Sequence, residues 1–193
     1  MEVVMHFFTS DTHFNHKNIC RGVSSWTDKT GTRDFLNLEV MNKTMIDNIN
    51  AVVQAGDVLY HLGDFAFLPQ RQTREVLDCL NGNIMIILGN HDTPSNLLHD
   101  RVRVVPSYAF QPEDVVIAMS HYPEKAAELA EDIGFCGHIH TQWRSWKRPD
   151  GKLIYNLGTD VWNYHPVSLR DIDDDIINPQ NRIVGEWKDS YHD

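Results

Sequence analysis

The sequence has few of the features that build disulfide frameworks, thiolate metal sites or membrane spans. Its three cysteines, Cys20, Cys79 and Cys136, lie far apart and form no C-x-x-C pair. This spacing argues against a zinc knuckle and against a disulfide scaffold. No apolar run approaches the roughly 20 residues that a transmembrane helix requires, and the first residues do not have the pattern of a signal peptide. We therefore expect a protein of the reducing cytoplasm that does not bind membranes.

Positive charge is also scarce. The chain has 17 lysines and arginines against 27 acidic residues, which gives a formal net charge of −10. Non-specific binding of long nucleic acids needs a basic surface, so we expect no such partner. A small phosphate-bearing substrate stays compatible with this charge, because bound divalent cations would reverse its sign locally. The sequence does not indicate an oligomeric state.

The length and composition predict one domain. The chain has 193 residues, 41% of them hydrophobic, which is enough for a sizeable core. We place this core at about residues 3–170 and an acidic, weakly patterned C-terminal tail at about 171–193. Apolar runs and turn signals predict strands at 3–9, 58–62, 84–88 and 115–119, one or two strands at 102–110, and a hairpin of 143–147 with 153–157. Helices are expected from Asp34 as N-cap to about 50, from Pro69 to a C-terminal cap at Gly82, and at 123–132.

Histidine is present in excess, and its distribution is informative. Of the eleven histidines, five lie in short polar pieces that follow apolar runs. The pieces are Asp11-Thr12-His13, Gly63-Asp64, Gly89-Asn90-His91-Asp92, Ser120-His121 and Gly137-His138-Ile139-His140. Ligand sites of mixed α/β sheets form beyond the C-terminal ends of strands, so these pieces should converge in space. Carboxylate, imidazole and amide groups without thiolates suit hard or borderline divalent metals.

Each piece alone is a weak signal. Asp11 and His13 are two residues apart, which places both side chains on one side of an extended chain. The same pair also fits a capping aspartate beside an unrelated surface histidine. His121 alone is more typical of a satisfied polar residue at a strand end. Asn90-His91-Asp92 is the most specific piece, although a polar turn before Thr93-Pro94 has the same composition. Only the order and spacing of all the pieces together favour a metal site.

Two Gly-Asp pairs, at 56–57 and 63–64, compete for one ligand position. The strand between them separates the two carboxylates by roughly 20 Å, at about 3.3 Å per residue. Asp57 precedes this strand and Asp64 follows it, at the end where the other candidates lie. We therefore choose Asp64 as ligand and expect Asp57 in a turn. Gly63 would let the backbone approach the site closely.

In order, spacing and ligand type, the pieces resemble the calcineurin-like metallophosphoesterase superfamily, from residue 9 to about 166. The resemblance implies an α/β fold, a four-layer α-β-β-α sandwich of two mixed sheets flanked by helices. It also implies two divalent metal ions. The first would be bound by Asp11, His13, Asp64 and His140, and the second by Asp64, Asn90, His121 and His138. Manganese is the first expectation from these oxygen and nitrogen ligands, and iron, zinc, nickel or cobalt also suit them.

The resemblance further implies the reaction and its residues. A hydroxide held by the two metals attacks a phosphate ester, while His91 contacts the phosphate and assists the leaving group. Asp92 is expected to orient a neighbouring imidazole. The piece Phe14-Asn15-His16-Lys17-Asn18-Ile19 resembles one compact branch, so His16 is a candidate for contacting the substrate. A histidine at a helix start on the rim of the site is an equal alternative. Asp160 to Pro166 resembles the closing segment of that branch, with Trp162 more typical of the core than of the pocket wall.

The chain departs from the superfamily pattern after Asp64. Protein Ser/Thr phosphatases carry Asp-Arg shortly after the Gly-Asp, whereas Phe65-Ala66-Phe67 stands here. The acidic partner of His91 is therefore missing at that place, which argues against protein phosphatase activity. We expect a small phosphodiester or nucleotide derivative as substrate, with a phosphomonoester as the alternative. A non-catalytic metal-binding scaffold is a further alternative, and the intact set of ligands argues against it.

Overall fold

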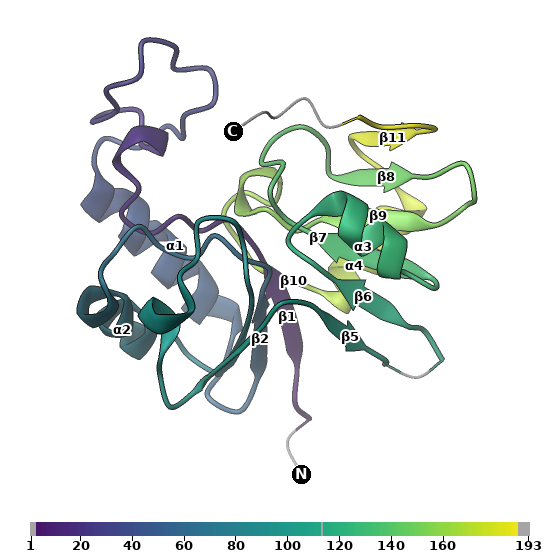
Figure 1. Cartoon of the computed structure of the whole chain (residues 1–193), viewed down its shortest axis with the longest axis horizontal. Coiled ribbons are helices and arrows are strands. Elements are labelled where there is room, and N and C mark those ends of the chain that lie inside the picture. Colours follow the sequence, from purple (N-terminus) through teal and green to yellow (C-terminus); the bar gives the residue numbers. More distant parts are fainter. Residues whose placement is uncertain (1–2, 113, 189–193) are drawn as a thin grey trace.

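The computed structural model of the protein describes residues 3–112 and 114–188. Two β-sheets pack face to face, with helices on their outer faces (Figure 1). The first sheet has the strand order β10 (Val167–Ser168), β1 (His6–Thr9), β2 (Val58–His61), β3 (Asn83–Ile87) and β4 (Val102–Val105). Strands β1 to β4 are parallel, and β10 is antiparallel to β1.

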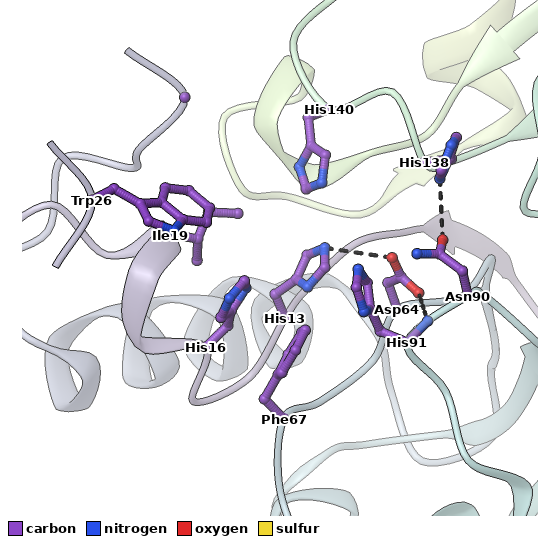
Figure 2. Close-up of a pocket in the computed structure, with 11 residues that line it drawn as sticks. His13, His16, Ile19, Trp26, Asp64, Phe67, Asn90, His91, His138 and His140 are labelled. Atoms are coloured by element: carbon purple, nitrogen blue, oxygen red, sulfur yellow. Dashed lines mark hydrogen bonds and ion pairs between the residues drawn. The ribbon is translucent and has the colours of Figure 1, made fainter. Parts of the chain in front are cut away.

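The second sheet is also mixed. Its order is β11 (Arg182–Val184), β8 (Ser145–Lys147), β9 (Leu153–Asn156), β7 (Ile133–Cys136), β6 (Ile117–Met119) and β5 (Tyr108–Phe110). Strands β6, β7 and β9 are parallel, and β8 and β9 form the antiparallel hairpin that the turn signals predict. The parallel strands of both sheets end at one edge of the sandwich, where the polar residues that follow them meet (Figure 2). This is the edge that can hold a site.

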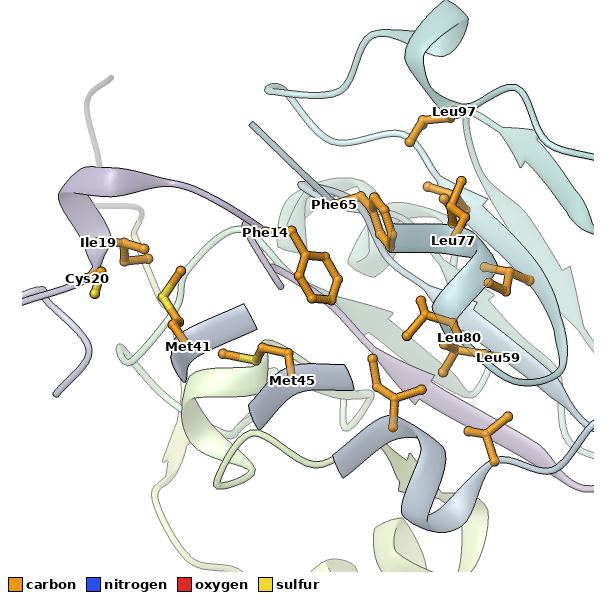
Figure 3. Packing of buried hydrophobic residues seen from close by; sticks show 14 residues of the cluster. Phe14, Ile19, Cys20, Met41, Met45, Leu59, Phe65, Leu77, Leu80 and Leu97 are labelled. Carbon is orange, nitrogen blue, oxygen red and sulfur yellow. The ribbon is translucent and has the colours of Figure 1, made fainter. Parts of the chain in front are cut away.

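Helices cover both outer faces and complete four layers. Helices α1 (Leu38–Val52) and α2 (Gln70–Cys79) cover the first sheet, and α3 (Pro123–Leu129) covers the second. Figure 3 shows Met45 of α1 and Leu77 of α2 in one cluster with Leu59 of β2. Three short 3₁₀ helices, η1 (Lys17–Ile19), η2 (Pro94–Leu97) and η3 (Thr159–Val161), lie in the connections. The expected α-β-β-α sandwich is confirmed.

Strand β3 explains why this sequence contains continuous apolar runs. Its Ile84 and Ile86 lie in the cluster under α1 and α2, whereas Met85 and Ile87 lie between the two sheets. Successive side chains of a strand point to opposite faces. A strand with both faces buried therefore has no polar alternation, as is typical of parallel sheets covered on both sides. Trp162 also packs against the layer between the sheets, as expected.

Three predicted helix ends are wrong. Helix α1 begins at Leu38 because the side chain of Asn37 accepts the Val40 N–H at 2.9 Å, whereas Asp34 is exposed and pairs with Arg21. Both residues are of the type that caps helices, and the sequence pattern alone does not separate them. Helix α2 ends at Cys79, and Gly82 lies beyond it in the turn into β3, with φ of 80°. Helix α3 is also shorter than expected.

The tail expected to be weakly patterned is instead ordered into elements over its described part. Helix α4 (Leu169–Ile177) begins with a capping box, in which Ser168 and Asp171 satisfy each other's backbone N–H groups. It buries Ile172, and Asp175 pairs with Arg144 at 3.2 Å. Strand β11 then pairs in parallel with β8. The sequence pattern does not indicate this helix because it is short and depends on its cap rather than on a long apolar period. In the described part of the chain, no helix is long and apolar enough to cross a membrane.

Candidate metal centre

The structure brings together all seven residues that the sequence predicts as metal ligands. Each follows the C-terminal end of a strand: β1 for two of them, β2, β3 and β6 for one each, and β7 for the last two. In that order the residues are Asp11 and His13, Asp64, Asn90, His121, and His138 and His140. Asp57 lies at the opposite end of β2, where it accepts the N–H groups of Met5 and Gln54 as a turn residue.

The imidazole of His13 lies close to two carboxylates, of which Figure 2 shows that of Asp64. Its Nε2 is 3.8 Å from Asp11 Oδ1 and 3.7 Å from Asp64 Oδ2. The ring is buried, and neither of its nitrogens has a hydrogen-bond partner. Burial, with the nearby imidazole of His140, lowers the pKa of His13 well below its ordinary value. The ring is therefore neutral and can offer a lone pair to a cation. A buried polar atom without a protein partner is typical of a position that an ion or a water molecule satisfies.

Two groups of side chains are close enough to hold ions. The ligand atoms of Asp11, His13 and His140 all lie within 4.8 Å of one another, and so do those of Asp11, Asp64 and His121. The carboxylate of Asp11 belongs to both groups. The sequence predicts Asp64 as the shared ligand, and its Oδ2 lies 3.7 Å from Nε2 of His13 in the first group and 3.4 Å from Nε2 of His121 in the second. This donor set, with its orphaned imidazole nitrogens, fits divalent metal ions.

The second group is extended by an amide and another imidazole. His121 donates from Nδ1 to the Leu62 carbonyl at 2.7 Å, so its Nε2 faces Asn90 Oδ1 at 3.0 Å and Asp64 Oδ2 at 3.4 Å. The Nδ1 of His138 lies 3.1 Å from the same Asn90 oxygen. Burial alone would lower the pKa of His121, but the hydrogen bond to Asp64 and the charges of Asp11 and Asp64 raise it to about 9. The carboxylates around Nε2 thus stabilise a positive charge at this position, and a metal cation would supply such a charge.

The backbone at these strand ends is in the left-handed region. Among the seven residues, five have positive φ: 55° at Asp11, 49° at His13, 56° at Asp64, 74° at His138 and 45° at His140. For residues other than glycine this conformation costs about 1–3 kcal/mol and is typical of functional sites. Hydrogen bonds between the loops maintain it, including those from the Asp11 N–H to Gly63 O and from the His13 N–H to Asp64 O, both at 3.0 Å.

Gly63 allows two of these loops to lie against each other. A Cβ at this position would be 2.6 Å from the backbone nitrogen of Gly89 and 2.7 Å from Nδ1 of His121. The φ of Gly63 is 98°, which an L side chain rarely adopts. The close approach expected of this glycine therefore occurs toward Gly89 and His121.

Asp92 acts on the backbone and not on an imidazole. Its Oδ2 accepts the N–H groups of Asp64 at 2.8 Å and Gly89 at 2.9 Å, and its Oδ1 accepts the Phe65 N–H at 2.9 Å. Asp92 thereby ties the loop after β2 to the loop after β3 and holds Asp64 in place. The sequence predicts that Asp92 orients an imidazole, whereas in the described residues its hydrogen bonds go to backbone N–H groups of these loops. His91 is held by its own N–H, which donates to Asp64 Oδ1 at 2.9 Å.

Two residues that the sequence analysis missed support His140. Asp160 accepts from His140 Nδ1 at 2.9 Å, and the buried guanidinium of Arg33 donates to both oxygens of Asp160, at 2.7 and 2.9 Å. Arg33 also donates to the carbonyl of Thr12 at 2.8 Å. Although burial opposes it, the charges of Arg33 and His140 hold the pKa of Asp160 well below its usual range. Such a carboxylate fixes the ring orientation of an imidazole ligand.

A cleft of about 360 Å³ opens beside these groups. His16 and Phe67 line it, with their rings stacked at a centroid distance of 3.9 Å and an angle of 16°. The ring of His16 lies 5.4 Å from that of His13. Burial, with the neighbouring imidazole of His91, lowers the pKa of His16 to about 4, so the ring is neutral at pH 7. His91 lines the same cleft and is exposed.

Comparisons with known proteins agree with this architecture. The family model described as calcineurin-like phosphoesterase superfamily domain matches residues 4–168. The uncharacterized protein MJ1445 of Methanocaldococcus jannaschii is 36% identical over 169 residues, which covers 84% of this chain and 86% of that protein. The Gene 66 protein of Mycobacterium phage L5 is 27% identical over 169 residues, covering 77% of this chain and 73% of that protein.

The crystal structure of the protein of unknown function AQ665 from Aquifex aeolicus superposes with a TM-score of 0.65. It is 24% identical and covers 89% of this chain and 99% of that one, which supports the fold alone. The family match extends over most of the sequence, including all seven candidate ligands and the cleft. The chain belongs to the calcineurin-like phosphoesterase superfamily.

Proposed function

We propose that the protein hydrolyses small phosphate esters with the help of two divalent metal ions. The observation that carries the proposal is the buried, neutral and unpartnered imidazole of His13 between the carboxylates of Asp11 and Asp64. Membership of the superfamily supports metal-dependent hydrolysis of phosphoesters in general.

The ligands divide between two ions. Asp11, His13, Asp64 and His140 would hold the first, and Asp64, Asn90, His121 and His138 the second. Manganese is our first choice because oxygen and nitrogen donors suit it, and iron, zinc, nickel or cobalt are alternatives. When bound, such ions lower the pKa of a bound water and neutralise charge on the phosphate.

The remaining residues bind and orient the substrate. His91 is exposed in the cleft, and its backbone is fixed to Asp64, so its ring can contact the phosphate and support the departing oxygen. His16 is neutral at pH 7, so it contributes hydrogen bonds rather than charge to substrate binding. Asp92 keeps Asp64 and His91 in register by joining their loops. Asp160 and Arg33 hold His140.

We propose a small phosphodiester, such as a nucleotide derivative, as the substrate. A cleft of about 360 Å³ is of the size that holds a small molecule. The net charge of −10 argues against a long nucleic acid as partner. The Phe65-Ala66-Phe67 sequence after Asp64 replaces the Asp-Arg signature of protein phosphatases. We place this activity in the cytoplasm, apart from membranes.

Hydrolysis of two chromogenic esters tests the proposal. Metal-stripped protein is refilled with Mn²⁺ and assayed with bis-p-nitrophenyl phosphate and with p-nitrophenyl phosphate, beside the variant His91→Ala. We expect metal-dependent turnover of the diester that is lost in the variant. Preference for the monoester would move the function to a phosphomonoesterase. Tight metal binding without turnover of either ester would contradict hydrolysis and favour a scaffold.

A further inference from the structure

One end of the cleft is built from aromatic rings that the hydrolytic chemistry does not require. Trp26 is 44% exposed and Phe67 is 37% exposed, and both line the cleft. Figure 2 shows Trp26 and Ile19 beside His16 at one end, and Asn90 and His138 at the other. Large apolar side chains left exposed in a concave site are typical of ligand-binding surfaces.

The rings at this end meet at defined angles. His16 stacks on Phe67 at 3.9 Å and 16°, and Trp26 stands at 89° to His16 with a centroid distance of 6.0 Å. The three rings therefore form a corner, which we call the aromatic corner. A flat ring in such a corner can stack on one wall while it meets the other edge to face. Both arrangements are favourable for aromatic pairs and are not open to a puckered aliphatic ring.

The loop that carries Trp26 is tied to the metal centre. Ser25 donates from both its N–H and its hydroxyl to Asn18 Oδ1, at 3.0 and 2.8 Å. The neck of the loop is closed by backbone bonds between Arg21 and Arg33 and between Arg33 and Ile19. Because Arg33 also holds Asp160 and the Thr12 carbonyl, the loop that carries the indole is anchored to the segments that bear the candidate ligands. A preorganised wall loses little entropy when it binds a ligand.

We propose that the aromatic corner of Trp26, His16 and Phe67 binds a planar aromatic group carried by the substrate phosphate, such as an aryl group or a nucleobase. The inference rests on the proposed function, because the phosphate of the same molecule is anchored at the metal centre. It names the class of ester: the substituent that lies on the His16 side is flat and aromatic rather than aliphatic.

The affinities of two matched phosphates, rather than their rates of hydrolysis, test this inference. Phenyl phosphate and cyclohexyl phosphate have the same anionic group and rings of similar size, but only the first ring is flat. Each is titrated calorimetrically into the Mn²⁺-loaded protein. We expect phenyl phosphate to bind about fivefold more tightly, which is the range of one aromatic contact. In Trp26→Leu the two should bind equally, through a loss for phenyl phosphate alone, and Trp26→Phe should retain part of the preference.

Tyr122 provides a matched control, an exposed aromatic ring on the opposite side of the metal centre from the aromatic corner. Its ring lies 5.1 Å from that of His138, at the other end of the centre, and it is 41% exposed. Tyr122→Leu should keep the preference for phenyl phosphate. Loss of the preference in Tyr122→Leu but not in Trp26→Leu would overturn the inference, and so would equal binding of the two phosphates by the unmodified protein. Hydrolysis of bis-p-nitrophenyl phosphate by the same preparation distinguishes failure of this inference from failure of the proposed function. Turnover with equal binding contradicts the aromatic corner alone, whereas no turnover and no binding of either phosphate contradicts the proposed function as well.

Discussion

Replacing Asp160 by asparagine should weaken metal binding and folding together, because this carboxylate serves a ligand and a buried cation at once. Asp160 accepts from His140 Nδ1 at 2.9 Å and from Arg33 at 2.7 and 2.9 Å. The side chains of Asp160 and Arg33 are 6% and 1% exposed. The variant Asp160→Asn leaves the guanidinium buried without its counter-charge.

The magnitudes follow from burial and from the role of the carboxylate. Breaking a buried ion pair by removing one partner costs about 3–5 kcal/mol. Loss of the carboxylate that orients an imidazole ligand weakens metal affinity about 10–100-fold. Arg33 and His140 hold the pKa of Asp160 below its usual range. The contribution of the ionised Asp160 to the free energy of unfolding is therefore complete above its unfolded-state pKa. It is lost only as pH falls through the lower folded-state value, so measurement at pH 7 captures all of it.

Asp175→Asn is the matched control for Asp160→Asn. Asp175 is 4% exposed in its side chain and pairs with Arg144 at 3.2 Å, on α4 and outside the candidate ligand set. Urea unfolding of the metal-free proteins should show destabilisation in both variants. Calorimetric titration with Mn²⁺ should show weaker binding only in Asp160→Asn. Unchanged Mn²⁺ affinity in Asp160→Asn, or an equal loss in Asp175→Asn, would refute the reasoning.

Three further predictions concern the backbone and pH. Burial lowers the pKa of His61 to about 3. The contribution of His61 to the free energy of unfolding of the metal-free protein should therefore be complete above pH 6.5 and decrease as the pH falls from there toward 3. His61 contributes up to about 1.4 kcal/mol per pH unit to this fall, and a urea series in which His61→Gln has the same slope would contradict it. Asp92→Ala removes a carboxylate that accepts three backbone N–H groups, and it should lower the free energy of unfolding by about 3 kcal/mol. The variant should also bind Mn²⁺ more weakly. Unaltered Mn²⁺ affinity would show that the position of Asp64 does not depend on Asp92. Gly63→Ala should lower the free energy of unfolding by several kcal/mol more than Gly151→Ala, as measured by thermal unfolding. Both glycines have positive φ, but only Gly63 has atoms within 4 Å of the added Cβ. Equal destabilisation of the two variants would contradict a steric contribution at Gly63.

The placement of the candidate ligands was accessible from the sequence because it depends on local patterns. An apolar run followed by a short polar piece marks the end of a buried strand, and parallel strands of one sheet end at a common edge. The choice of Asp64 over Asp57 needed only the length of a strand. The fold class followed from the same pieces through the family resemblance, and the structure confirms it.

Contacts between distant segments were not accessible in this way. Arg33 and Asp160 are separated by 127 residues, and neither lies in a piece whose composition indicates an ion pair. The role of Asp92 depends on which N–H groups two loops leave unpaired, and that is decided by tertiary structure. The start of α1 was missed because Asp34 and Asn37 are both good N-cap residues, and only the path of the chain selects one.

The candidate ligands come from both sheets, so binding of metal ions would stabilise the packing of one sheet against the other. Asp11, His13, Asp64 and Asn90 follow strands of the first sheet, whereas His121, His138 and His140 follow strands of the second. An ion held by residues of both sheets cross-links them at one edge, and a ligand that binds only the native state stabilises it by about 2.7 kcal/mol at a concentration of 100 times its Kd. If ions bind there as proposed, the thermal stability of the chain would rise with the concentration of the metal, and a chelator would lower it.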